Sequence, residues 1–99
     1  MTGGLGRAGA EDLRLVVLRL LAESSGYRAN ESLLKMALAD WGHVVSRDRV
    51  RSELSWLAEQ GLTTLREIGG VMIAELTGRG GDVASGAAVA PGVRRPSPD

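Results

Sequence analysis

Two adjacent glycines between two strand-like segments constrain this fold more than any other feature of the chain. Gly69-Gly70 separates Leu-Thr-Thr-Leu-Arg-Glu-Ile (62–68) from Val-Met-Ile-Ala-Glu-Leu-Thr (71–77), and both segments alternate strand-forming and polar residues. A two-residue hairpin turn needs positive φ at both positions, which glycine adopts without steric cost. The pattern predicts a β-hairpin. Its expected pairs are Ile68 with Val71, Arg66 with Ile73, and Thr64 with Glu75.

The predicted hairpin has two unlike faces. The face that we assign to the core carries Leu65, Met72, Ala74 and Leu76. The opposite face carries Ile68, Val71 and Ile73 among polar residues, which would leave an exposed apolar patch on a lone domain. Either the register is shifted by one residue, which would exchange the faces, or these three side chains meet a partner. The second interpretation is favoured.

Three helical segments precede the hairpin. Residues 11–24 begin with two acids that suit a helix N-terminus, and Gly26 follows their end. Asn30 is a suitable N-cap for a second helix that Gly42 ends, and Leu33, Leu34, Ala37, Leu38 and Trp41 recur there at helical spacing. Ser46 caps a third helix with Gly61 just past its end. The order predicts a mainly α fold with a small β-hairpin (α+β): a winged helix-turn-helix, three helices followed by a two-stranded wing.

Glycine and proline concentrate at the two ends of the chain. Nine of the 14 glycines lie in residues 1–9 or after residue 77, and all three prolines lie after residue 90. Both residues disfavour regular structure in element interiors. We therefore expect a flexible N-terminal segment (1–9), a folded domain (10–77), and a flexible tail (78–99) that could form a short helix near 82–88.

Composition excludes several classes of protein. With 99 residues, no cysteine and one histidine, the chain has no disulfide framework, zinc cluster or thiol nucleophile. It has no long apolar run and no secretory signal, which predicts an intracellular domain without a membrane partner. His43 stands without a catalytic neighbour, and the glycine clusters lie outside any βαβ unit. We therefore expect no enzyme activity, no metal and no cofactor.

The first helix carries two apolar stripes. The main stripe is Leu13, Val16, Val17, Leu20 and Leu21, and a second one, Leu15, Leu18 and Ala22, lies roughly opposite. A surface helix needs one such face. The second stripe is covered either by the C-terminal segment or by a partner chain, and Leu15 and Leu18 would then form a dimer interface.

Four segments also resemble known proteins. Residues 44–54 (Val-Val-Ser-Arg-Asp-Arg-Val-Arg-Ser-Glu-Leu) and 56–62 (Trp-Leu-Ala-Glu-Gln-Gly-Leu) resemble the recognition helix of the winged-helix superfamily. Ile68-Gly69-Gly70 and residues 74–80 (Ala-Glu-Leu-Thr-Gly-Arg-Gly) resemble its wing and the exit from the wing. The match covers residues 12–80 and implies the winged-helix fold.

Two groups within that superfamily are similar to this chain. The helix-wing layout resembles ArsR-type repressors, but their metal sensors use Cys, His and acidic ligands, and the absence of cysteine argues against that role. The ending, residues 82–98, is similar to that of small winged-helix proteins of Mu-like bacteriophages and prophages. This resemblance implies a phage origin and a role in the bacterial host's cytoplasm.

The start of the third helix is the candidate DNA-binding site. In helix-turn-helix proteins this end of the recognition helix enters the major groove. The residues placed there are Ser46, Arg47, Asp48, Arg49, Arg51 and Ser52, with Arg66 of the hairpin as a backbone contact. Arginine suits guanine edges and phosphates, serine can bind either, and Asp48 could accept from cytosine or hold an arginine.

Charge and side-chain chemistry leave two functions open. Residues 44–79 contain five arginines and five acids, so a monomer should bind DNA weakly and a homodimer would double the contacts. Trp56 could stack on DNA or, more simply, pack on the wing, and Arg94 and Arg95 of the tail are either inert or phosphate contacts. The primary hypothesis is a phage transcriptional regulator that binds double-stranded DNA. The alternative is an adaptor or assembly factor that binds a phage protein through its apolar faces.

Overall fold

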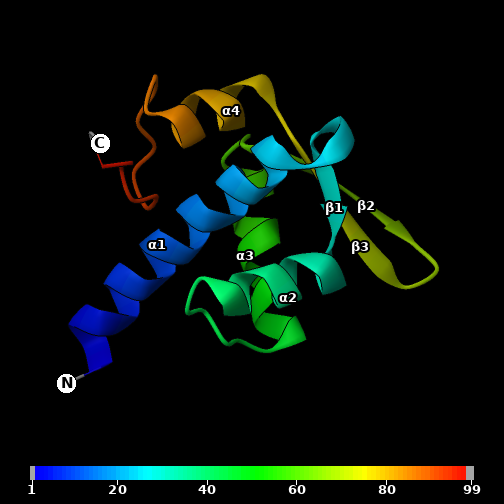
Figure 1. The fold of residues 1–99 in the computed structure, drawn as a ribbon, viewed down its shortest axis with the longest axis horizontal. Helices are drawn as coiled ribbons and strands as arrows, with labels where there is room; N and C mark the ends of the chain where they lie inside the picture. The colour runs from blue at the N-terminus through cyan, green and yellow to red at the C-terminus, as the bar shows by residue number, and fades with distance from the viewer. Residues whose placement is uncertain (1, 98–99) are drawn as a thin grey trace.

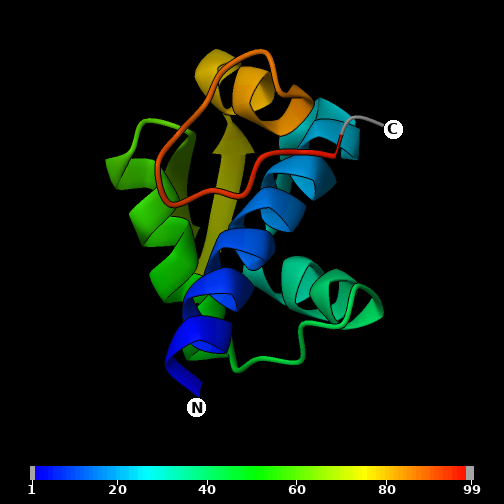
Figure 2. The ribbon, with the colours of Figure 1, turned by 90° about the vertical axis from the view of Figure 1, so that its left-hand side faces the viewer.

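Helices α1 (Thr2–Glu23), α2 (Glu31–Asp40) and α3 (Arg47–Glu59) form the helical part of the molecule, and α2 packs against both α1 and α3 (Figures 1 and 2). The computed structural model describes residues 2–97. The remaining elements are the 3-10 turn η1 (Ser25–Tyr27), the strands β1 (Arg28–Asn30), β2 (Thr63–Ile68) and β3 (Val71–Leu76), and helix α4 (Gly78–Ser85). The α+β fold with a wing after the third helix is confirmed.

The wing is a three-stranded antiparallel sheet in the order β1-β3-β2. The predicted register of its hairpin is confirmed: Ile68 pairs with Val71, and Arg66 with Ile73. Gly69 and Gly70 have φ of 58° and 79°, as the tight turn requires. The expectation of only two strands was wrong, because β1 adds to β3 from Arg28 to Asn30. A strand of three residues is too short to show alternation in the sequence.

The two predicted helix caps are confirmed. Asn30 Oδ1 accepts a hydrogen bond from Leu33 N at 2.8 Å, and Ser46 Oγ accepts one from Arg49 N at 3.0 Å. Each cap satisfies an amide that has no partner inside its helix. The two caps therefore fix where α2 and α3 begin.

The core lies between α1, α2, α3 and the inner face of the sheet. Its fully buried side chains include Leu13, Val17, Leu18, Leu21, Leu34, Leu38, Val50, Leu54, Leu57 and Leu62. The predicted inner face of the wing is confirmed, since Ala74 is buried and Leu65, Met72 and Leu76 pack against the core. Across residues 2–97, no helix is long and apolar enough to span a membrane.

Both ends of the chain differ from the expected flexible segments. Helix α1 begins at Thr2 rather than at residue 11, because extending an existing helix costs little even through glycines such as Gly6 and Gly9. The C-terminal helix spans 78–85 rather than 82–88, and Thr77 caps it by accepting from Gly80 N at 2.9 Å. The chain then returns along α1 (Figure 2), where Ala90 and Val93 are buried. The folded unit therefore extends beyond residues 10–77; residues 1, 98 and 99 lie outside the described part.

The second stripe of α1 is covered within the chain itself. Leu15 and Leu18 are 2% and 0% exposed, and α4 packs on this side of α1 with Val83 and Ala84 buried. Of the two interpretations of this stripe, the dimer interface at Leu15 and Leu18 was wrong. Glycine and proline prevent most regular structure in the tail, but they do not prevent its few apolar side chains from packing.

Candidate nucleic-acid interface

Helix α3 turns its apolar side inward and its polar N-terminal side toward solvent. Val50, Leu54 and Leu57 are buried, whereas Ser46, Asp48 and Ser52 are exposed. The Arg47, Arg49 and Arg51 side chains are 53%, 41% and 28% exposed. The structure thus brings the predicted DNA-binding residues of the helix together at its first two turns.

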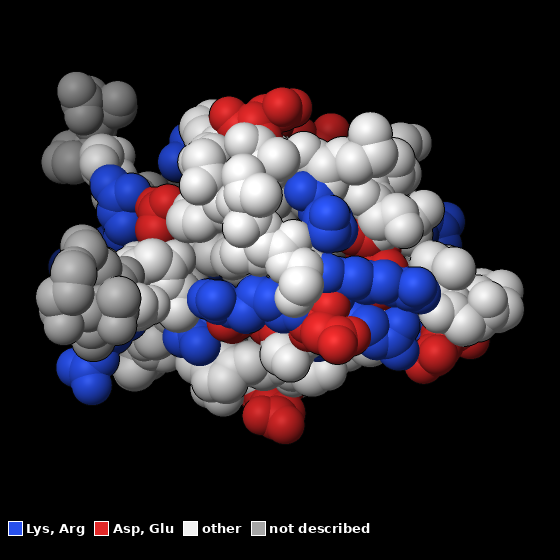
Figure 3. All heavy atoms as spheres, turned by 90° about the horizontal axis from the view of Figure 1, so that it is seen from below, with Lys and Arg blue, Asp and Glu red and all other residues white. Residues whose placement is uncertain are grey.

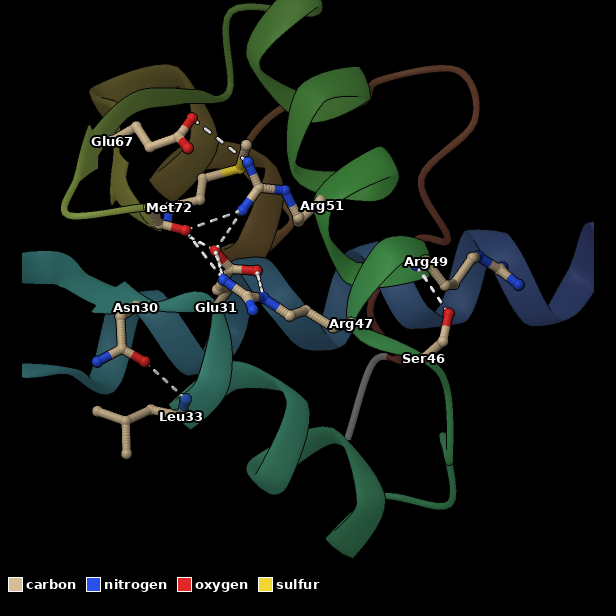
Figure 4. A network of polar contacts seen from close by, with 10 residues as sticks. Asn30, Glu31, Leu33, Ser46, Arg47, Arg49, Arg51, Glu67 and Met72 are labelled. Carbon is tan, nitrogen blue, oxygen red and sulfur yellow. Dashed lines mark hydrogen bonds and ion pairs between the residues drawn. The ribbon is translucent and has the colours of Figure 1, made fainter.

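A buried carboxylate holds two of these arginines (Figure 4). The Glu31 side chain, at the start of α2, is completely buried and accepts from Arg47 Nε and Arg51 Nη1, both at 2.7 Å. It also accepts from the backbone N of Met72, on β3, at 2.6 Å. Arg47 Nη2 further donates to the Gly70 carbonyl at 2.9 Å. One carboxylate therefore fixes α3 against both α2 and the wing.

The hydrogen bonds of this cluster stabilise the ionised form of Glu31. The bond from Arg47 is the largest cause, burial opposes it, and the bond from Met72 N and the charges of Arg47 and Arg51 add to it. Together they lower the pKa of Glu31 from 4.5 to about 2. Because the pKa of Glu31 is lower in the folded chain than in the unfolded chain, the ionised cluster stabilises the fold in full at pH values above the unfolded-state pKa. This stabilisation is lost as the pH falls toward 2.

This linkage predicts a specific pH dependence for Glu31→Gln. The stability lost through the substitution should be constant above pH 5 and should shrink steadily as the pH falls from about 4.5 to about 2, because wild-type Glu31 becomes protonated there. Urea unfolding of wild type and of Glu31→Gln at a series of pH values measures the difference between their unfolding free energies. If this free-energy difference were as large at pH 2.5 as it is above pH 5, the assignment of the low pKa to Glu31 would be contradicted.

The third arginine belongs to a separate cluster on the α1 side of the helix. Arg49 Nε donates to Glu53 at 2.9 Å, and Arg14 Nε of α1 donates to the same carboxylate at 2.7 Å. The Arg14 guanidinium lies over the Trp56 ring, 4.0 Å from its centroid, and its Nη1 donates to the Gly92 carbonyl. Trp56 therefore packs against α1 and the C-terminal segment, and the expectation that it packs on the wing was wrong.

The arginines are more fully paired than the sequence indicated. The sequence predicted exposed arginines at the start of the third helix and considered only Asp48 as a residue that could hold one of them. In the structure Glu31, Glu53 and Glu67 each contact one or two of these arginines. Seen from below, the face that carries α2 and the start of α3 shows a band of basic side chains with acidic ones directly beside it (Figure 3). Sequence reasoning placed Glu31 only as a charge at a helix N-terminus. Its burial depends on the wing, and no local signal indicated it.

Other predicted residues lie apart from the helix. Arg66 is exposed on β2, and Ile68 is 57% exposed at the wing tip, while Val71 and Ile73 are half-buried. Because the register is confirmed, the exposed Ile68 is a real feature of the wing surface. Among the described residues the wing turn carries no basic side chain, as the sequence predicted.

Residues of the loop before α3 and of the C-terminal segment meet at Asp12 of α1. His43 Nε2 lies 2.7 Å from Asp12 Oδ2, and Arg94 Nη1 donates to Asp12 Oδ1. Partial burial raises the pKa of Asp12, but the hydrogen bonds from His43 and Arg94 outweigh it, so the net shift is downward. Arg94 is thus a structural contact, and this cluster anchors the loop that leads into α3.

Comparison with known proteins was made against families, sequences and structures. No family model matches the chain. Protein gp26 of Escherichia phage Mu is 50% identical over 88 residues, which cover 89% of this chain and 91% of gp26. A protein of Haemophilus influenzae Rd is 53% identical over 70 residues, which cover 70% of this chain and 68% of that protein.

The fold is also found in a solved structure. Sco5413, a MarR family transcriptional regulator from Streptomyces coelicolor, superposes with a TM-score of 0.64 and 26% sequence identity over 75% of this chain. The chain spans about half the length of that regulator, 49%. The likeness supports the winged-helix fold, and the neighbour belongs to the MarR family, so the expected ArsR-like layout is not confirmed.

Proposed function

Given that this chain belongs to the family of the phage Mu protein gp26, we propose that it is a small phage-encoded transcriptional regulator that binds double-stranded DNA. In this proposal the N-terminal end of α3 enters the major groove, and the protein acts in the cytoplasm of its bacterial host. The structural likeness to a transcriptional regulator supports the proposal, because the superposition covers 75% of this chain.

The observation that carries the proposal is the set of donors left available on Arg47 and Arg49. Arg47 uses Nε and Nη2 for Glu31 and Gly70, and Arg49 uses Nε for Glu53. Within residues 2–97 no hydrogen bond engages Nη1 of Arg47 or either Nη of Arg49, and both side chains are about half exposed. Each guanidinium is thus fixed by an ion pair with an acid and keeps other N–H donors available to a ligand. Because the side chain is already fixed, less conformational entropy is lost when it binds a base edge or a phosphate.

The remaining residues take supporting roles. Arg51 is engaged through both Nη1 and Nη2, with Glu31 and Glu67, so we assign it to positioning the helix and to the electrostatic attraction of phosphates. Ser46, Asp48 and Ser52 are exposed and within the groove-facing turns, and Arg66 stands on the wing as a backbone contact. Because the formal net charge is +0, we also propose that two copies act together to reach useful affinity.

The proposal is tested with Arg49→Gln, which leaves Glu53 its bond to Arg14 and should therefore fold normally. We expect it to cost about 1–3 kcal/mol of DNA-binding free energy and to reduce the salt dependence of binding by about one phosphate contact. Arg79→Gln, an equal change of charge at an exposed position on α4, is the matched control and should bind as wild type does.

Fluorescence anisotropy with duplex fragments of the source genome, at two salt concentrations, measures both the DNA-binding free energy and its salt dependence. If Arg49→Gln and Arg79→Gln weaken binding equally, the attraction is general charge and the recognition-helix assignment fails. If wild type does not bind at the lower salt concentration, the DNA-binding proposal itself fails.

A second candidate function has one specific observation in its favour. The arginines of α3 are largely neutralised by acids, while Ile68 at the wing tip is 57% exposed beside Glu67. An adaptor that binds a phage protein through Ile68, Val71 and Ile73 would use this surface and would not need strong DNA binding. Substitution of Ile68 would then abolish function while Arg49→Gln would not.

A further inference from the structure

Helix α2 carries an exposed apolar stripe that the DNA-binding proposal does not use. Leu33, Met36 and Trp41 are 57%, 68% and 61% exposed, although Leu34 and Leu38 on the same helix are fully buried. Leu33, Ala37 and Trp41 follow one another at intervals of four residues along the outer side of α2. Single exposed apolar residues are ordinary, but three large ones on a single short helix mark a contact surface.

A hollow lies beside the N-terminal half of this stripe. It has a volume of about 420 Å³ and is lined mainly by apolar side chains, among them Leu20, Ala29, Leu33, Leu34 and Ala37. Trp41 stands at the other end of α2, next to a smaller crevice against α1. The surface therefore carries both a large projecting aromatic side chain and an apolar hollow that could receive one.

We propose that this face binds a second copy of the chain, with the two α2 helices crossing antiparallel at Ala37. A two-fold axis at this residue pairs positions equally far from it on opposite sides, and Leu33 and Trp41 each lie four residues away. Trp41 of each copy then contacts Leu33 of the other and enters the hollow. A small residue at the crossing point allows the two helix axes to approach closely.

The charges around the stripe favour a second copy over another kind of partner. Its exposed rim contains two basic residues, Arg19 and Arg28, and two acidic ones, Glu23 and Asp40. A two-fold interface sets a surface against itself, so a rim of one sign would repel and a balanced rim does not. A rim with balanced charges has no net electrostatic attraction for a strongly acidic or strongly basic partner.

The proposed interface leaves the recognition helix uncovered. Among the described residues, those that line the two hollows beside the stripe belong to α1, α2 and the segment between them, and none belongs to α3. The proposed interface is also separate from the wing face of Ile68, Val71 and Ile73 and from the buried stripe of Leu15 and Leu18. Dimerisation is measured without DNA, so its outcome is independent of the DNA-binding proposal.

Sedimentation equilibrium of the full chain, with and without Trp41→Ala, tests the proposal. We expect a dimer whose dissociation constant Trp41→Ala raises about tenfold or more, because a large aromatic anchor is lost from each side of the interface. Val89→Ala, at a residue 56% exposed elsewhere, is the matched control and should leave the dimer unchanged. Trp41 and Val89 are both exposed, so neither variant should impair folding.

Cysteine substitution locates the two-fold axis, since the chain has no cysteine of its own. Ala37→Cys should form an intermolecular disulfide under mild oxidation, because a disulfide requires the two Cα atoms to lie within roughly 7 Å. Ala39→Cys, exposed on the other side of the same helix, should not. A monomer at all concentrations, a dimer that Ile68→Ala dissociates and Trp41→Ala does not, or equal cross-linking at both cysteines would overturn the proposal.

Discussion

Replacing Glu31 with glutamine should lower the thermal midpoint of unfolding by on the order of 10 °C. The side chain is 0% exposed and receives three donors, from Arg47, Arg51 and Met72 N. Glutamine keeps the shape but offers one acceptor oxygen, and its NH₂ group faces guanidinium donors that it cannot satisfy. Both arginines lose a charged partner, and the contact between α3 and the wing weakens.

Glu67→Gln is the matched control for this prediction. Glu67 also pairs with Arg51, at 3.3 Å, but its side chain is 54% exposed, and exposed ion pairs contribute little to stability. Thermal unfolding followed by circular dichroism compares the two variants. Equal midpoints for Glu31→Gln and Glu67→Gln would show that the buried carboxylate does not hold the recognition helix.

Gly80→Ala should destabilise the fold by about 3 kcal/mol. A Cβ at this position would lie 2.1 Å from the Leu62 carbonyl oxygen and 2.7 Å from Leu76 Cδ1. The carbonyl is held in place, since it accepts a hydrogen bond from Thr77 N at 3.1 Å. Helix α4 would have to move away from β2 and would then expose the second stripe of α1.

Gly81→Ala separates this clash from the general effect of glycine in a helix. Its Cβ would meet only Leu76 Cδ2, at an ordinary contact distance of 3.7 Å. Alanine is the better helix former, so this variant should be neutral or more stable by about 0.5–1 kcal/mol. Urea unfolding of Gly80→Ala and Gly81→Ala measures the change in unfolding free energy that each substitution causes. If Gly80→Ala were as stable as Gly81→Ala, α4 would not dock against Leu62 as described.

Features that depend on neighbouring residues could be predicted from the sequence. The caps at Asn30 and Ser46 and the turn at Gly69-Gly70 each need one residue type at one position, and all three are present in the structure. The hairpin register followed from the turn. Together these local signals were sufficient for the winged-helix order of elements.

Features that depend on contacts distant in the sequence could not be predicted. Strand β1 is defined by its pairing with β3, and the C-terminal segment by its packing on α1. The burial of Glu31 could not be predicted, because its carboxylate contacts Met72, 41 residues away. The sequence predicted exposed arginines at the start of α3, but it did not predict that Glu31 and Glu67, which are distant in the sequence, pair with Arg47 and Arg51.

An NMR titration of the labelled chain with duplex DNA tests the central claim, DNA binding through the start of α3, most directly. Backbone amide shifts report the site of contact without requiring any substitution. The account predicts that the changes concentrate in residues 46–52 and at the neighbouring wing turn, with α4 and the C-terminal segment unaffected. Changes confined to α2 or the C-terminal segment, or no changes at low salt, would contradict it.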